Sequence, residues 1–120
     1  MMNGEGYRDP TPYLASKHAR AGEIWTVMTQ YGPKPALLMQ VYENIIRVLY
    51  IYPTDRLQES EYTRDLKQGR IDIRQLTWTV PAELVSYAGR LPKELMVDIE
   101  TQIAKTLEHY KDIVQGGDCE

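Results

Sequence analysis

The sequence predicts a mainly β domain closed by one C-terminal α-helix. Its 120 residues suit a single domain with one hydrophobic core. Short segments rich in β-branched and aromatic residues alternate with glycine, proline and asparagine, which is typical of strands joined by turns. Only the C-terminal part repeats apolar residues at every fourth position over a long stretch, and this spacing places them on one face of a helix.

The first residues are polar. Residues 1–10 contain glycine, proline and charged side chains, which predict a loose arm. Thr11 and Pro12 suit the N-cap and the first position of a helix, so we expect a short helix near residues 13–20. Residues 1–21 are therefore interpreted as an N-terminal arm with a short helix.

The β pattern begins directly after this arm. Residues 24–29 alternate bulky and polar side chains, with Trp25 and Val27 on one face, as in a half-buried strand. Residues 31–35 contain one glycine and two prolines, and we expect a loop. Residues 36–42 are a short apolar run that suits a strand buried on both faces.

Further strands follow. Glu43 and Asn44 suit a two-residue hairpin turn, since asparagine tolerates a left-handed backbone. Residues 45–52 give the strongest strand pattern, and a proline ends it. Residues 56–70 predict a long loop with at most one short strand, whereas residues 71–78 alternate again and predict a strand. Residues 81–89 suit either a strand or a helical turn.

The C-terminal segment predicts an amphipathic helix. Pro92 suits the first helical position, and Gly116 with Gly117 suits the end. The expected barrel domain therefore spans residues 22–115, followed by a flexible tail at residues 116–120. The apolar stripe is formed by Leu95, Ile99, Ile103 and Leu107, and is continued by Tyr110 and Val114. Core packing explains this stripe, and its width also suits a dimer contact.

Composition limits the classes of function. The net charge is −3 and the pI about 5.4, whereas proteins that grip nucleic acid usually carry a basic surplus. No cluster of cysteine, histidine or carboxylate residues has metal-ligand spacing, so we expect no metal and no other cofactor. The lone Cys119 suits a reducing compartment. Since no apolar run approaches the roughly 20 residues of a membrane span, we expect a cytoplasmic protein with no membrane partner.

Four motifs occur in a characteristic order. They are Gly-Glu-Ile-Trp at residues 22–25, Lys-Pro-Ala-Leu-Leu at residues 34–38, Pro-Thr at residues 53–54, and Gly-Arg-Leu-Pro-Lys-Glu-Leu at residues 89–95. This set resembles the MazF/PemK family, and the similarity spans residues 22–110. The resemblance implies an SH3-like small β-barrel of the MazF/PemK (CcdB-like) type, usually a homodimer. It also implies a ribosome-independent endoribonuclease that a small cognate antitoxin inhibits.

The resemblance also indicates a site. Metal-independent cleavage uses the 2′-hydroxyl of the RNA as nucleophile, and the protein assists proton transfer and stabilises the phosphate. Where the family carries an arginine before Pro-Ala, this sequence has Lys34. Lysine keeps the positive charge but lacks the planar guanidinium group that binds two phosphate oxygens at once. The family's threonine after the third strand corresponds to Asp55. Either Thr54 replaces that threonine, or Asp55 is the general base beside Arg56, or Asp55 only begins a turn.

The remaining candidates would bind substrate. Gln75 lies where the family often has a glutamine, and Arg74 replaces an aspartate before it. Several tyrosines could stack RNA bases, although packing explains them equally well. They are Tyr31, Tyr42, Tyr50, Tyr52 and Tyr62.

Two functions remain open from the sequence. The first is a toxin-like endoribonuclease that cleaves single-stranded RNA, with Lys34 as phosphate clamp and acid, and Asp55 or Thr54 as its partner. The second is a catalytically degenerate barrel that binds a protein or nucleic acid without cleavage. The acidic composition and the two altered positions favour the second function, whereas the activity of many family members favours the first.

Overall fold

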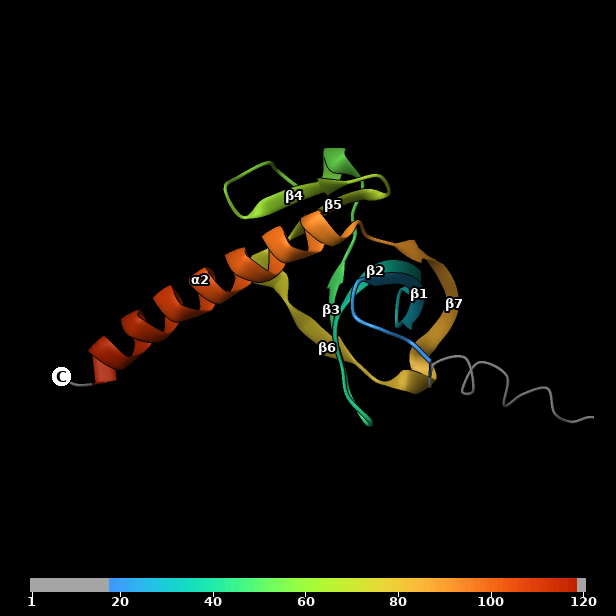
Figure 1. Cartoon of the computed structure of the whole chain (residues 1–120), viewed down its shortest axis with the longest axis horizontal. Helices are drawn as coiled ribbons and strands as arrows, with labels where there is room; N and C mark the ends of the chain where they lie inside the picture. Colours follow the sequence, from blue (N-terminus) through green and yellow to red (C-terminus); the bar gives the residue numbers. More distant parts are fainter. Residues whose placement is uncertain (1–17, 119–120) are drawn as a thin grey trace, which may run out of the picture.

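The computed structural model describes residues 18–118, and it confirms a mainly β domain with a C-terminal helix (Figure 1). The strands are β1 (Glu23–Thr29), β2 (Gly32–Val41), β3 (Ile46–Tyr50), β4 (Thr63–Leu66), β5 (Gly69–Asp72), β6 (Thr77–Thr79) and β7 (Leu84–Arg90). Three single turns of 3-10 helix are η1 (Thr54–Arg56), η2 (Ile73–Gln75) and η3 (Pro81–Glu83), and the long helix is α2 (Lys93–Asp118).

Most strands form one strongly curled sheet. Its order is β6-β3-β2-β1-β7, with every neighbouring pair antiparallel. Strands β4 and β5 form a separate hairpin that lies beside the first turns of α2 (Figure 1). A bridge between Tyr52 and Arg70 joins this hairpin to the chain that leaves β3.

The middle of β2 is buried on both faces of the curled sheet, which explains its uninterrupted apolar run. Leu37 and Met39 belong to one core cluster, together with residues of α2 and of the hairpin. Ala36 and Leu38 point to the other face, into the cluster that the curled sheet encloses. Because successive side chains of a strand alternate between faces, a strand with both faces covered shows no polar alternation. Ala19, just before β1, is 3% exposed and belongs to the enclosed cluster.

Helix α2 packs only its first turns on the barrel and then extends away from it (Figure 1). Ile99 is fully buried, and Leu95 and Ile103 are partly buried against the same cluster, which confirms the stripe over these positions. Arg64 of β4 donates to Asp98 Oδ2 of α2 at 2.7 Å and so ties the hairpin to the helix. None of the helices in the described residues has the length and apolar character needed to span a membrane.

The expected end of the helix is wrong. Helix α2 continues through Gly116 and Gly117 and ends at Asp118. Glycine permits the left-handed turn that often ends a helix, but it does not enforce that turn. The expected helix near residues 13–20 lies mostly outside the described residues, and residues 18–20 are not helical.

The segment expected to be a loop at residues 31–35 is a strand. Gly32 to Pro35 begin β2 and pair with the end of β1, which leaves only Gln30 and Tyr31 as the turn. Proline is tolerated in a strand wherever its missing N–H would not have paired. The site residue Lys34 therefore lies on a strand.

The strand expected over residues 71–78 is interrupted in its middle: residues 71–72 end β5 and residues 77–78 begin β6, with η2 between them. Strand β5 ends at Asp72, whose side chain accepts a hydrogen bond from the Arg74 N–H at 2.9 Å and starts the turn η2. Short polar side chains often compete with strand pairing in this way. The predicted loop over residues 56–70 instead contains β4 and the first residues of β5.

Two turns differ from expectation. The connection between β2 and β3 has four residues, closed by a hydrogen bond from Tyr42 N–H to Ile45 O at 2.9 Å. No non-glycine residue in the described part of the chain has a positive φ, so Asn44 does not adopt the left-handed backbone. Residues 81–89 contain both alternatives, first the turn η3 and then β7.

Candidate functional site

Lys34 lies beside the chain that leaves β3. Strands β2 and β3 pair Ala36 with Tyr50, and Ile51 N–H continues this register by donating to Pro35 O at 2.9 Å. The Lys34 ammonium is 5.5 Å from the centroid of the Tyr31 ring and 5.8 Å from that of Tyr52. The Lys34 ammonium therefore lies close to two aromatic rings, at the end of the sheet where the chain leaves β3 and leads to η1.

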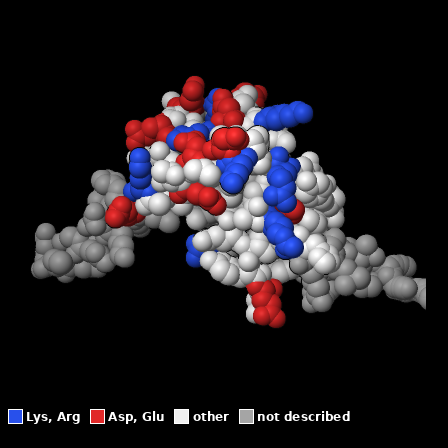
Figure 2. Space-filling model, viewed as in Figure 1, with Lys and Arg blue, Asp and Glu red and all other residues white. Residues whose placement is uncertain are grey.

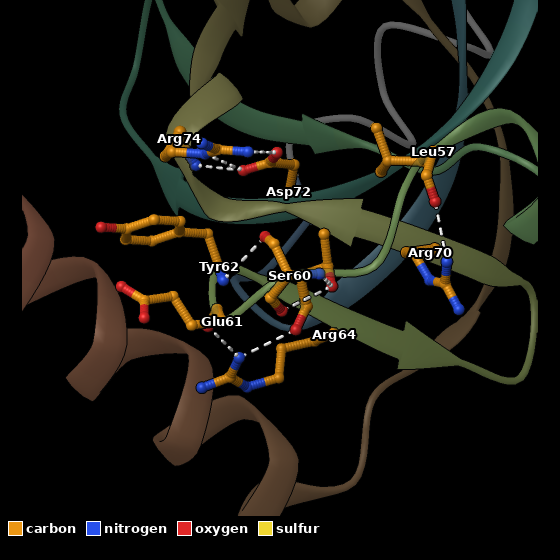
Figure 3. Close-up of polar contacts among 9 residues, drawn as sticks. Leu57, Ser60, Glu61, Tyr62, Arg64, Arg70, Asp72 and Arg74 are labelled. Carbon is orange, nitrogen blue, oxygen red and sulfur yellow. Dashed lines mark hydrogen bonds and ion pairs between the residues drawn. The ribbon is translucent and has the colours of Figure 1, made fainter.

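The segment after Tyr52 is anchored by one arginine of the hairpin. Tyr52 and Arg70 exchange both backbone hydrogen bonds, at 2.9 and 2.7 Å. The Arg70 side chain then donates to Leu57 O at 2.7 Å (Figure 3). It also donates to Thr54 O at 3.3 Å. Asp65, directly opposite on β4, pairs with the same guanidinium. The backbone at both ends of η1 is thereby fixed to the hairpin.

The side chains of η1 remain available to a ligand. Thr54, Asp55 and Arg56 are all exposed, whereas their backbone is fixed. Arg56 N–H donates to Pro53 O at 2.9 Å, which closes the turn. Asp55 thus has the place of a turn residue, with an exposed carboxyl group beside the candidate site.

Arg74 and Gln75 lie at the other end of β5. Arg70 lies near the start of β5, whereas Arg74 and Gln75 belong to η2, which follows the end of this strand at Asp72. Figure 3 shows Arg74 and Leu57 at opposite ends of this strand. The structure thus places Lys34 beside Tyr52, two residues before η1, and it places Arg74 and Gln75 in the separate turn η2.

Arg74 is engaged by a buried carboxylate that the sequence analysis did not single out. Its Nη2 lies 2.6 Å from Oδ2 of Asp72, which is 4% exposed, and its Nε donates to Oδ1 at 3.0 Å. The Arg74 side-chain hydrogen bonds lower the pKa of Asp72, and the Arg74 backbone N–H and charge act in the same direction against the effect of burial. The Arg74 guanidinium also lies 4.6 Å from the Tyr62 ring centroid. Its first role is therefore to neutralise Asp72.

The motif at residues 22–25 is a structural unit. Glu23 is 8% exposed, and its Oε1 accepts hydrogen bonds from Trp25 Nε1 at 2.9 Å and from Arg20 N–H at 3.0 Å. Arg90, opposite Glu23 on β7, donates to Oε2 at 3.0 Å. A buried carboxylate requires such partners, so these residues fix the start of β1 and stand outside the candidate site.

The anchor Arg70 also went unnoticed in the sequence. The signal that identifies it is the run Asp65-Leu-Lys-Gln-Gly-Arg70, in which opposite charges flank a turn that contains glycine. Such a run predicts a cross-strand ion pair at the mouth of a hairpin. The backbone carbonyls that Arg70 also binds carry no sequence signal.

Charges of both signs mix over the hairpin and the first turns of α2, as Figure 2 shows. On the same face, the lower part of the barrel is largely uncharged. Within residues 18–118, no three histidine, cysteine, aspartate or glutamate side chains meet in a metal-binding group. Arg70 contacts the η1 carbonyls but is paired with Asp65, which leaves Lys34 and Arg56 as the candidates for binding a phosphate.

This barrel, with its closing helix and a loop anchored beside a strand cation, has the fold of the MazF-type endoribonuclease toxins. A mycobacterial endoribonuclease in complex with its cognate antitoxin superposes with a TM-score of 0.66 and 17% identity, over 75% of this chain and 95% of that one. A second mycobacterial endoribonuclease gives 0.61 and 16%, over 75% and 91%.

A MazE–MazF structure from Deinococcus radiodurans gives a TM-score of 0.65 and 11% identity, over 74% of this chain and 94% of that one. No protein-family model and no curated protein sequence matches the chain. The barrel fold that the sequence motifs implied is confirmed by these structures.

Proposed function

We propose that this protein is a toxin-type, metal-independent endoribonuclease that cleaves single-stranded RNA. The observation that carries the proposal is the position of Lys34, between the rings of Tyr31 and Tyr52 and beside the anchored η1 segment. A cation on a strand and a fixed, exposed loop are what binding of a scissile phosphate requires. The shared fold of solved endoribonucleases supports the same activity.

The chemistry needs a base, a cation and an acid. The 2′-oxygen attacks the phosphorus after a base takes its proton, and the bond to the 5′-oxygen breaks as that oxygen receives a proton. In our proposal Lys34 neutralises the charge on the phosphate and protonates the leaving oxygen, while Asp55 or Thr54 serves as its partner. Arg56 contributes a second positive charge from the same turn, and Arg74 and Gln75 contact RNA further along.

A catalytically degenerate barrel is the second candidate, and one observation favours it. Asp55 presents an exposed carboxyl group where the family has a threonine, and a negative charge there opposes the approach of a phosphate. Such a protein would bind a partner without cleaving RNA.

A cleavage assay distinguishes the two candidates. The protein is mixed with a short single-stranded RNA in the presence of EDTA, and with the same strand carrying 2′-deoxy nucleotides. The endoribonuclease should cut the RNA and leave the deoxy strand intact. An RNA that stays intact at micromolar protein would exclude the enzymatic function.

The change Asp55→Thr should tighten RNA binding by a few-fold at low salt, because it removes a negative charge from the site. Binding and cleavage are measured on one RNA at fixed salt, with Glu100→Gln on α2 as a control that makes the same charge change elsewhere. Retained cleavage would identify Asp55 as a turn residue, whereas lost cleavage with tighter binding would identify it as the base. If neither quantity responds, the site does not lie at η1.

We also propose a homodimer and a cognate antitoxin as partners. Strand β7 is an edge strand whose residues 85–88 are all exposed, including Val85 and Tyr87, and unpaired edges of this kind are suited to association. Two of the solved neighbours are complexes with antitoxins. Light scattering at micromolar concentration should give twice the chain mass of 13.9 kDa, and a stable monomer would contradict the dimer.

A further inference from the structure

The structure distinguishes the tyrosines that the sequence left equivalent. Tyr50 is partly buried against the enclosed core, and Tyr62 packs on the Arg74 guanidinium. Tyr42 lies at the turn between β2 and β3, at the other end of β2 from Lys34. Only Tyr31 and Tyr52, among the described tyrosines, lie against the Lys34 ammonium.

Tyr31 combines high exposure with a fixed backbone. It is 79% exposed, the highest value among the exposed large apolar and aromatic side chains of the described residues. Its N–H donates to the Thr29 hydroxyl at 3.1 Å, and that hydroxyl donates to Gly32 O at 2.7 Å. A tyrosine ring that the fold leaves in water on a fixed turn, beside the Lys34 ammonium, is accessible to a ligand.

We propose that Tyr31 is a nucleobase-stacking residue, whose ring packs against one base of single-stranded RNA next to the phosphate that Lys34 holds. The ammonium lies toward one face of the ring, and the high exposure leaves the other face open to a base. Unpaired bases stack on aromatic side chains, and the rigid turn lowers the entropic cost of that contact. This inference rests on the proposed function, because it takes single-stranded RNA as the ligand.

The test uses affinity for an RNA that cannot be cut. A short single-stranded RNA with 2′-O-methyl groups is titrated with the intact protein, and fluorescence anisotropy is measured at fixed salt. Tyr31→Ala should weaken binding by roughly 5- to 100-fold, the range of a lost base–aromatic stack. Tyr31→Phe and Tyr31→Trp should keep the wild-type affinity, because both retain an aromatic face. Tyr42→Ala, a matched change at a 52% exposed tyrosine, should have no effect.

A second titration separates stacking from an indirect effect on Lys34. The same RNA is prepared with an abasic nucleotide at each position in turn. One abasic position should weaken binding to the wild type and have no effect on Tyr31→Ala, because both changes remove the same contact. If Tyr31→Ala weakens binding to all these RNAs equally, the ring acts through Lys34 and the stacking proposal is wrong.

The two proposals fail in different ways. If the wild type binds the RNA and Tyr31→Ala binds it equally well, only the stacking proposal is overturned. If the wild type binds no RNA, the proposed function falls together with it. Circular dichroism of each variant checks that the fold is retained. We expect it to be retained, because the substituted side chain is exposed and lies on a turn.

Discussion

Replacing Lys34 by alanine should lower the rate of RNA cleavage by roughly 100- to 1,000-fold, the usual effect of removing one group that stabilises charge in a transition state. The reason is that, among the described lysines, only Lys34 holds its ammonium between the Tyr31 and Tyr52 rings, next to the η1 segment. Initial rates on one RNA at fixed salt measure the change.

Two further variants make this result specific. Lys34→Arg keeps the positive charge, so RNA binding should stay within a few-fold of the wild type. Lys67→Ala removes an exposed lysine from the turn between β4 and β5 and should leave the rate unchanged. Cleavage by Lys34→Ala at the wild-type rate, or an equal decrease in Lys67→Ala, would show that Lys34 is not the phosphate-binding residue. An exposed cation–π interaction stabilises a fold by only about 1 kcal/mol, so Lys34→Ala should remain folded.

Among the described glycines, Gly69 should give the largest loss of stability when it is replaced by alanine. The new Cβ would overlap the Tyr52 carbonyl oxygen and would lie 2.8 Å from Ile51 Cγ2, both on the chain that leads to η1. The φ of Gly69 is +153°, a conformation that side chains with a Cβ rarely adopt. Strain costs about 1–3 kcal/mol and overpacking roughly 2 kcal/mol more.

Gly89 is a matched control for this variant. Its φ is +152°, but the nearest atom to an added Cβ is Gln68 Nε2 at 3.7 Å, an ordinary contact. Gly89→Ala should therefore show the cost of strain alone. Urea unfolding followed by tryptophan fluorescence compares the free energies of unfolding of the two variants. Equal destabilisation would mean that the close approach of Gly69 to Tyr52 does not constrain the barrel.

Local patterns in the sequence predicted the elements whose stability comes from one periodic apolar face. Alternation indicated β1 and four-residue spacing indicated the start of α2, whereas residue type indicated β3 and an apolar run indicated the middle of β2. These patterns succeed because burial on a face acts on every second or every fourth residue. The middle of β2 differs from the other elements, because both of its faces are buried and its apolar run therefore shows no alternation.

Local patterns failed where a single contact decides the backbone. Strand β5 stops at Asp72 because the carboxylate accepts the Arg74 N–H, and nothing in the alternation of residues 71–78 reveals that bond. The prolines at positions 33 and 35 predicted a loop, although pairing with β1 holds them in a strand.

For the candidate site, the sequence by itself determined the chemical groups: a lysine before Pro-Ala, and a threonine, an aspartate and an arginine after the third strand. Only the tertiary structure decided how they are arranged. Lys34 meets the rings of Tyr31 and Tyr52 because β2 and β3 pair in one register, and η1 is fixed because Arg70, from a hairpin later in the chain, binds its carbonyls. Arg74 forms an ion pair with Asp72. Residue type and spacing depend on the chain alone, whereas the contact of Lys34 with Tyr52 and that of Arg70 with the carbonyls of the η1 segment join residues brought together only when the strands pair and the hairpin docks, and no local pattern encodes them.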